Sequence, residues 1–243
     1  MTNLIPSPDR SLFARSLSVV VVLCSTFMIP MTGNSQTTGA RSSIESSKSS
    51  GGNGRAEHSL GRNKNEFSLW VAGSFGLPAA LGGSRDRKIP LLVGLRYGRV
   101  LAASKYAGLE YTFDLVPAAL VSGPKGGFSN PGGLASPGGG RNYVYGAGFI
   151  PVGFKLFVAP EHRIKPYLTV SSGPIYFTKQ VPVPDSANFN FISTAGGGVQ
   201  IFLSSRRAIN VEYRVGHLSN AGVGNLNPGF NSSTIHAGFS VFR

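Results

Sequence analysis

Apolar and polar residues alternate with a period of two in segments of about ten residues, and eight such segments follow one another along the chain. Successive side chains of a β-strand point to opposite faces, so this alternation predicts strands with one apolar and one polar face. Turn-forming glycine, proline and asparagine separate the segments. The expected strands are Phe67–Phe75, Leu91–Leu101, Tyr106–Leu115, Tyr143–Leu156, Tyr167–Phe177, Phe189–Leu203, Ile209–Ser219 and Ser233–Phe242.

The length and number of these segments indicate a membrane barrel. Tilted strands of about 9 to 11 residues cross a bilayer, with apolar residues facing out and polar residues facing in. Eight strands close into a barrel whose bore is filled by side chains. The sequence therefore predicts an all-β, eight-stranded antiparallel transmembrane β-barrel over residues 66–243, with no open pore. Charged residues expected to pair inside it are Arg96, Glu110, Asp114, Lys155, Glu212 and Arg214.

Two further features fit a barrel in a membrane. Tyrosines near the segment ends suit interfacial girdles, where amphipathic rings lie at the level of the lipid headgroups. Two long stretches, Gly76–Pro90 and Val121–Asn142, are expected to be external loops. The girdle candidates are Tyr97, Tyr106, Tyr143, Tyr167 and Tyr176.

The first 35 residues are typical of a cleaved secretory signal peptide. Arg10 and Arg15 precede the apolar run Leu17–Cys24, and Gly33–Ser35 offers a cleavage site between small residues. A transmembrane anchor is the alternative, but Pro30 and polar residues break the run. Cys24 is the only cysteine. Its removal with the signal would leave no thiol chemistry, disulfide or cysteine-based metal site.

Residues 36–65 are rich in serine, glycine and basic residues and contain little to bury, which predicts a disordered basic linker. The formal charge of the whole chain is +13; loss of Arg10, Arg15 and Asp9 leaves 21 positive and 9 negative residues, or +12. Such an excess favours an anionic partner. For an exported chain we expect phosphorylated or acidic lipid as this partner, and we do not expect nucleic acid.

The segment Ile209–Ser219 places His217 and Ser219 on the same parity as Val211 and Val215, which is the lipid-facing side of the barrel. An imidazole activates a serine hydroxyl by taking its proton, and a third group holds the imidazole in the required tautomer. An enzyme that cleaves lipids would need its nucleophile on this face. The alternative is that Asn220–Asn231 merely forms a turn.

The residues after His217 carry a longer motif. His217-Leu218-Ser219-Asn220-Ala221-Gly222, followed by an Asn- and Gly-rich stretch to Asn231, resembles the outer-membrane lipid A 3-O-deacylase family. Pro151–Phe154 and Lys165–Leu168 look like more degenerate motifs of the same family. The resemblance covers Phe67–Arg243 and is sharp in the last third. It implies an eight-stranded barrel that hydrolyses the 3-position acyl ester of lipid A with a Ser-His-Glu triad on its outer wall.

Carried over by position, the resemblance makes Ser219 the nucleophile and His217 the general base, but Asn231 occupies the position of the family's glutamate. An asparagine carbonyl can orient an imidazole, although it supplies no negative charge. Glu212 lies on the opposite parity and is expected inside the barrel, as is His236. The resemblance also implies an oxyanion-binding or substrate-positioning role for Asn220, Gly222 and Asn227.

Three hypotheses remain open at this point. The first is an outer-membrane carboxylic ester hydrolase acting on lipid A or lipopolysaccharide, without cofactor or metal, as a monomer or a homodimer. Its loop cations would hold the lipid phosphates. The second is a catalytically weak or inactive outer-membrane barrel with a structural or interaction role. The third is a soluble barrel with its apolar face inward. The candidate phosphate-binding cations are Arg85, Arg87, Lys88 and Lys125.

Overall fold

The computed structural model describes residues 59–74, 87–124, 141–183 and 185–243. The expected signal peptide (1–35) and most of the expected linker (36–65) lie outside these ranges, as do residues 75–86 and 125–140 of the two long connections. The described part of the chain contains no helix that is long and apolar enough to cross a membrane.

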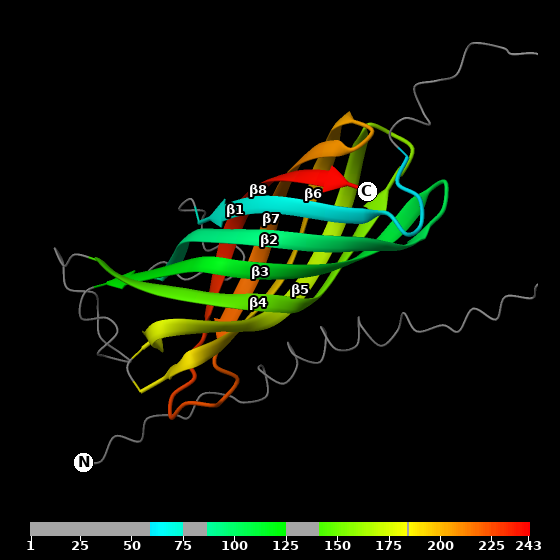
Figure 1. Cartoon of the computed structure of the whole chain (residues 1–243). Helices are drawn as coiled ribbons and strands as arrows, with labels where there is room; N and C mark the ends of the chain where they lie inside the picture. Colours follow the sequence, from blue (N-terminus) through cyan, green and yellow to red (C-terminus); the bar gives the residue numbers. More distant parts are fainter. Residues whose placement is uncertain (1–58, 75–86, 125–140, 184) are drawn as a thin grey trace, which may run out of the picture. The chain divides into compact units, whose positions relative to one another are not determined.

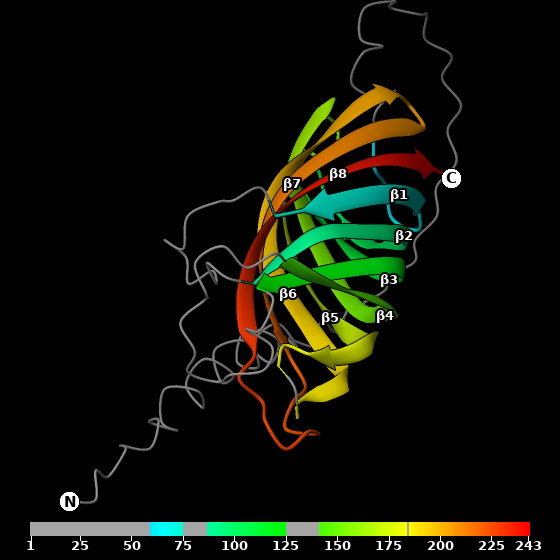
Figure 2. The ribbon, with the colours of Figure 1, turned by 90° about the vertical axis from the view of Figure 1, so that its left-hand side faces the viewer.

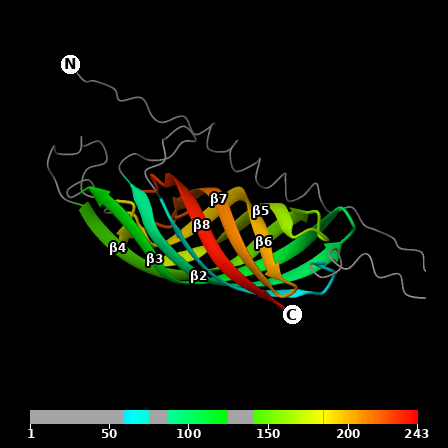
Figure 3. The same ribbon diagram turned by 90° about the horizontal axis from the view of Figure 1, so that it is seen from above.

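Eight strands form a closed barrel in which each strand pairs antiparallel with its neighbours in sequence, and β1 closes the barrel against β8 (Figures 1 and 3). The predicted fold class is therefore confirmed. The strands are β1 (Asn65–Gly73), β2 (Lys88–Ala103), β3 (Ala107–Pro124), β4 (Arg141–Val158), β5 (Ile164–Val181), β6 (Ala187–Ser204), β7 (Arg207–Ser219) and β8 (Phe230–Phe242).

Several strands are longer than the alternation predicts. β3, β4, β5 and β6 each span 18 residues, or roughly 60 Å of extended chain, which exceeds the thickness of a bilayer even after tilting. The predicted loop Val121–Asn142 begins late, because Ser122 still pairs with Tyr143. The predicted loop Gly76–Pro90 ends early, because Lys88 already belongs to β2. Backbone pairing with a neighbouring strand overrides the local turn preference of glycine and proline at these ends.

The two ends of the barrel differ in their connections. The turns β2–β3, β4–β5 and β6–β7 are short and lie at the end that holds the start of β1 and the end of β8; we call this the short-turn end (Figures 1 and 2). Leu60 is buried here against Val100 and Phe157, and its backbone N–H donates to the Pro160 carbonyl at 3.1 Å. Residues 59–65, the last part of the expected linker, therefore pack onto the barrel.

The inner wall carries the charged residues that the alternation assigns to it. Arg96, Glu110, Asp114, Lys155, Glu212 and Arg214 are all buried. Lys155 pairs with Glu66 and with Glu110, the latter at 2.8 Å between Nζ and Oε2. Two apolar clusters, one around Trp70 and Ile175 and one around Phe157 and Phe202, add to the filling. The bore is thus packed with side chains, as predicted.

The outer wall is apolar. Leu69, Leu95 and Leu168 expose 54%, 49% and 65% of their surface, which places the apolar parity outside. The hypothesis of a soluble barrel with this parity inward is therefore wrong. Tyr106, Tyr143 and Tyr176 point outward near strand ends, as expected of a girdle. Tyr167 does not, because it falls on the inward parity of β5 and is buried at the short-turn end.

Candidate active site

His217 and Ser219 lie at the last residues of β7, far from the short-turn end. Leu218 between them is buried in the barrel, so the two polar side chains point to the outer wall, where both are half-buried. Residues two apart on a strand share a face. Both side chains therefore point outward, as the sequence predicts.

Asn231 enters the site through the pairing of β7 with β8, which sets it directly opposite His217. Its Oδ1 lies 2.7 Å from Nδ1 of the imidazole. With a carbonyl oxygen as partner, Nδ1 carries the proton, and Nε2 is left with its lone pair. This is the tautomer in which Nε2 can accept a proton from a serine hydroxyl. The structure thus brings His217 and Asn231 into contact and places Ser219 two residues along the same face of β7, while the catalytic roles of all three remain predictions.

Gly229 is a residue of the site that the sequence analysis missed. It is buried, it has a φ of +53°, and a Cβ atom at this position would lie 2.9 Å from Cε1 and 3.1 Å from Nε2 of His217. A side chain here would push on the Nε2 edge of the imidazole. The Asn-Pro-Gly sequence before β8 signals a turn, but it does not indicate that the turn approaches His217.

The turn between β7 and β8 is held together by Asn220, whose side chain is fully buried. Its Nδ2 donates to the Leu226 carbonyl at 2.8 Å, and its Oδ1 accepts from the backbone N–H of Gly222 at 3.0 Å. Its own backbone N–H donates to Oδ1 of Asn227 at 3.1 Å. The backbone N–H groups of Asn220 and Gly222 and one N–H of the Asn220 side chain are therefore used within the turn. In the hydrogen bonds of this described turn, Nδ2 of Asn227 is not engaged.

A row of outward polar residues continues across the neighbouring strands. Ser193 on β6 pairs with His217, and Ser172 on β5 pairs with Ser193. The hydroxyl oxygens of Ser172 and Ser193 lie 2.8 Å apart. Sequence reasoning missed both serines, because only the strand register places them beside His217. Polar groups are costly against lipid unless they are hydrogen-bonded, so this row is unusual for an outer wall.

A model of the family described as "Lipid A 3-O-deacylase (PagL)" matches residues 105–240, which is more than half of the chain and includes the strands from β3 to β8. The chain belongs to this family. The resemblance found in the sequence is thereby confirmed. Together with the apolar outer wall, membership also confirms the expected outer-membrane location. No curated protein matches the chain.

Solved structures similar to this chain include other barrels of the outer membrane. The crystal structure of the outer-membrane enzyme PagL shares 17% identity over 71% of this chain and 97% of that chain, with a TM-score of 0.45. The N-terminal β-barrel domain of Pseudomonas aeruginosa OprF shares 11% identity over 76% and 100%, with a TM-score of 0.40. OprG from the same organism shares 8% identity over 76% and 98%, with a TM-score of 0.44.

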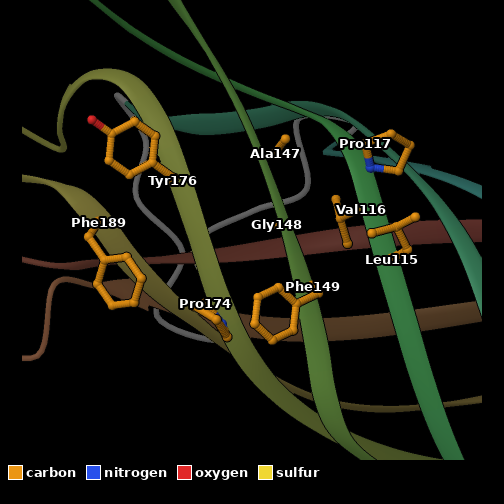
Figure 4. Close-up of a pocket in the computed structure, with 9 residues that line it drawn as sticks. All are labelled: Leu115, Val116, Pro117, Ala147, Gly148, Phe149, Pro174, Tyr176 and Phe189. Atoms are coloured by element: carbon orange, nitrogen blue, oxygen red, sulfur yellow. The ribbon is translucent and has the colours of Figure 1, made fainter.

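An apolar groove of about 370 Å³ lies over β3, β4, β5 and the start of β6 in this lipid A 3-O-deacylase family member. Phe149 and Phe189 flank Pro174 in it (Figure 4). The ring of Phe189 contacts that of Phe191 edge-to-face at 5.1 Å, and Phe191 is paired with Ser219 across β6 and β7. One end of the groove therefore lies on β6, the strand that pairs with β7 beside Ser219.

Other titratable residues of this family member lie elsewhere. Glu212 is inside the barrel, where it accepts from Arg96 and Arg214, so it cannot reach His217. His236 is also internal; its Nε2 lies 3.0 Å from Oγ1 of Thr234 and its ring packs on Trp70. The described ranges contain no group of three or more His, Cys, Asp or Glu that could hold a metal. Of the loop cations, Arg87 and Lys88 are described and half-buried, whereas Arg85 and Lys125 lie outside the described residues.

Proposed function

We propose that the protein is an outer-membrane esterase that removes the 3-O-linked acyl chain of lipid A, with Ser219 as its nucleophile. The observation that carries this proposal is the hydrogen bond between His217 and Asn231 on the lipid-facing wall, with Ser219 on the same face of β7. Family membership supports the same reaction. The substrate would be lipid A or lipopolysaccharide in the surrounding leaflet.

The reaction would proceed by acyl transfer to Ser219 and then to water. The serine oxygen attacks the ester carbonyl carbon while Nε2 of His217 takes the hydroxyl proton. The imidazole then gives this proton to the departing 3-oxygen, which leaves as a hydroxyl. Water, deprotonated by the same imidazole, attacks the acyl-serine; the imidazole then returns this proton to the serine oxygen as the fatty acid is released. Asn227, whose Oδ1 accepts from the backbone N–H of Asn220 beside Ser219, would offer its Nδ2 to the developing oxyanion.

Asn231 would serve as a neutral orienting residue. In serine proteases, exchange of the triad acid for its amide lowers turnover by about 10⁴ because the wrong tautomer is held. Here the amide presents Oδ1 to Nδ1 of His217, which is the favourable arrangement. The missing negative charge still leaves the imidazolium less stabilised than beside a carboxylate. We therefore expect hydrolysis that is slow for this family.

The substrate would contact the barrel at two further places. An acyl chain can lie along the apolar groove that leads from Phe149 to Phe189 (Figure 4). Lipid phosphates would meet Arg87 and Lys88, and Arg85 and Lys125 are expected to join them. The contact with the phosphates agrees with the net positive charge of the chain.

The direct test is to incubate the purified, folded protein with lipid A in detergent and identify the released fatty acid by mass spectrometry. We expect Ser219→Ala and His217→Ala to lower release by roughly 10³-fold or more. The matched control is Ser193→Ala, which removes a hydroxyl that is also next to His217 and should retain most of the activity. Release that persists in Ser219→Ala would refute the assignment.

A serine-directed phosphonate gives an independent readout, because peptide mapping of the labelled protein identifies which hydroxyl is activated. We expect the label on Ser219, and label on Ser193 instead would move the nucleophile to β6. A folded wild-type protein that releases no fatty acid and takes no label would favour the alternative, a non-catalytic barrel. The neutral residue at position 231 is the observation that keeps this alternative open.

A further inference from the structure

The short-turn end of the barrel is strongly basic. Its exposed residues include a set of arginines and lysines contributed by the turns and by the strand ends, which we call the basic collar. Among the described residues, Glu161 is the exposed acidic side chain at this end. The basic collar consists of Arg62, Lys64, Arg99, Lys105, Arg163, Arg206, Arg207 and Arg243.

The basic collar has no acidic partner in the described part of the chain. The ion pairs found there all lie in the bore, around Lys155 and Arg96 and between Arg214 and Glu212. Within the collar, Nε of Arg163 donates to a backbone carbonyl. Nζ of Lys105 lies 4.8 Å from the centre of the Tyr106 ring. The positive charge of this end is therefore not neutralised by the barrel itself.

Two collar arginines point toward lipid rather than into the aqueous space beneath the barrel. Arg207 shares the outward face of β7 with Val211, and Arg99 shares that of β2 with Leu95. Between Leu95 and Arg99 lies Tyr97, whose ring contacts Phe67 at 5.6 Å. From the middle of the wall toward the short-turn end, apolar side chains are followed by aromatic rings and then by guanidinium groups. This order matches the change from hydrocarbon to headgroup at the edge of a bilayer.

The distance along β7 places the collar and the candidate site at opposite edges of the membrane. Arg207 is the first residue of β7 and Ser219 is the last. The twelve steps between them correspond to about 40 Å of strand, or about 30 Å along the membrane normal for a tilt near 40°. The hydrocarbon core of a bilayer is also about 30 Å thick. Each group therefore lies at one boundary of the apolar region.

We propose that the basic collar binds the phosphate groups of anionic phospholipids in the leaflet opposite to the one that the candidate site faces. Guanidinium groups bind phosphate oxygens in a bidentate manner. Their positive charge attracts anionic headgroups more strongly than zwitterionic headgroups, whose net charge is zero. Binding would fix the depth and tilt of the barrel, and so keep the His217 row at the far boundary. The proposal needs only an inserted barrel and does not depend on esterase activity.

The test measures which phospholipid stays bound to the purified full-length protein. The protein is equilibrated in nonionic detergent with equal amounts of phosphatidylglycerol and phosphatidylcholine, and the retained lipid is counted by native mass spectrometry. We expect wild type to retain phosphatidylglycerol at least threefold over phosphatidylcholine. The double variant Arg99→Gln with Arg207→Gln should lose most of this preference. The charge-preserving double Arg99→Lys with Arg207→Lys should keep most of it.

The matched control removes the same charge from the other end of the barrel, where Arg141 and Lys179 are exposed. The double variant Arg141→Gln with Lys179→Gln should keep the preference of wild type. Equal retention of the two phospholipids by wild type would overturn the proposal, and so would equal losses in the two glutamine doubles. Fatty acid release from lipid A, measured on the same preparations, tests the esterase separately, because the collar variants leave Ser219 and His217 intact.

Discussion

Polar side chains of the same kinds have different surroundings on the inner and the outer wall of this barrel. Inside, Gln200 donates to Asn210 at 2.9 Å, and Asn210 donates to Ser240 at 2.6 Å, in a bore filled with such contacts. Outside, the polar row is narrow, and its members, such as His217, border lipid. A polar group enclosed in the bore can act only on its protein neighbours, whereas one on the outer wall can also meet a molecule of the membrane.

The two histidines of β7 and β8 illustrate the contrast. His236 is 3% exposed and packs between Trp70 and Thr234 in the bore. His217 is half-buried on the outer wall, with Asn231 at Nδ1 and the backbone of Gly229 close to Nε2. Both residues are histidines on neighbouring strands, and they differ in the face of the strand from which their side chains project. Substitutions inside should therefore affect stability, and substitutions outside should affect the reaction.

The largest expected effect comes from breaking the inner network at Glu212. This carboxylate accepts from Arg96 and Arg214, and its loss leaves buried cations without a partner. We expect Glu212→Ala to lower the free energy of unfolding by about 3 to 5 kcal/mol. Urea titration of the protein in lipid vesicles measures this. The exposed Glu161→Ala should change it by less than about 0.5 kcal/mol, and similar losses in both variants would contradict the distinction.

A second variant changes Gly229, whose backbone lies beside His217 on the outer wall. Gly229→Ala places a methyl group against the imidazole edge, and a displacement near 1 Å can cost about 10²-fold in rate. The control is Gly61→Ala at the short-turn end, where no atom lies within 4 Å of the added Cβ. Gly229→Ala should also lose about 1 kcal/mol or more of stability from backbone strain at its φ of +53°. If kcat for lipid A falls equally in both variants, the contact with His217 is not the cause.

The third variant restores a charge at the neutral position of the site. Asn231→Asp keeps the shape of the side chain and adds a carboxylate beside Nδ1 of His217. Extra stabilisation of the imidazolium by about 1.4 kcal/mol would raise kcat by about tenfold. Asn225→Asp adds the same charge to the adjoining turn and should leave kcat unchanged. An unchanged rate in Asn231→Asp would show that position 231 does not act on the imidazole.

The smallest expected effect concerns the apolar groove. Ala147→Trp fills it, and we expect release of a long acyl chain to fall roughly threefold relative to hydrolysis of a short-chain ester, since loss of a few buried methylene contacts has this size. Ala237→Trp adds the same ring to the outer wall of β8 and should not change this ratio. Comparing kcat/KM for the two substrates measures it, and a fall for both substrates alike would argue against an acyl-chain site.

Much of the fold could be predicted because the period-two alternation is a local property. It places Arg96 and Glu212 inside and Val211 and His217 outside without any knowledge of strand pairing. Tyr167 was misplaced because a tyrosine near a segment end fits either face. The ends of β3 and β4 were also missed, since pairing between Ser122 and Tyr143 extends both strands through residues that by themselves favour turns.

The sequence by itself determined the barrel, the sidedness of its walls and the candidate pair His217 and Ser219, because each follows from spacing along one strand. Only the tertiary structure decided what surrounds that pair: Asn231 at hydrogen-bonding distance, Ser193 across the sheet and the backbone of Gly229 against the ring. These neighbours depend on the register between strands. Register is set by closure of the whole barrel, which no single segment encodes.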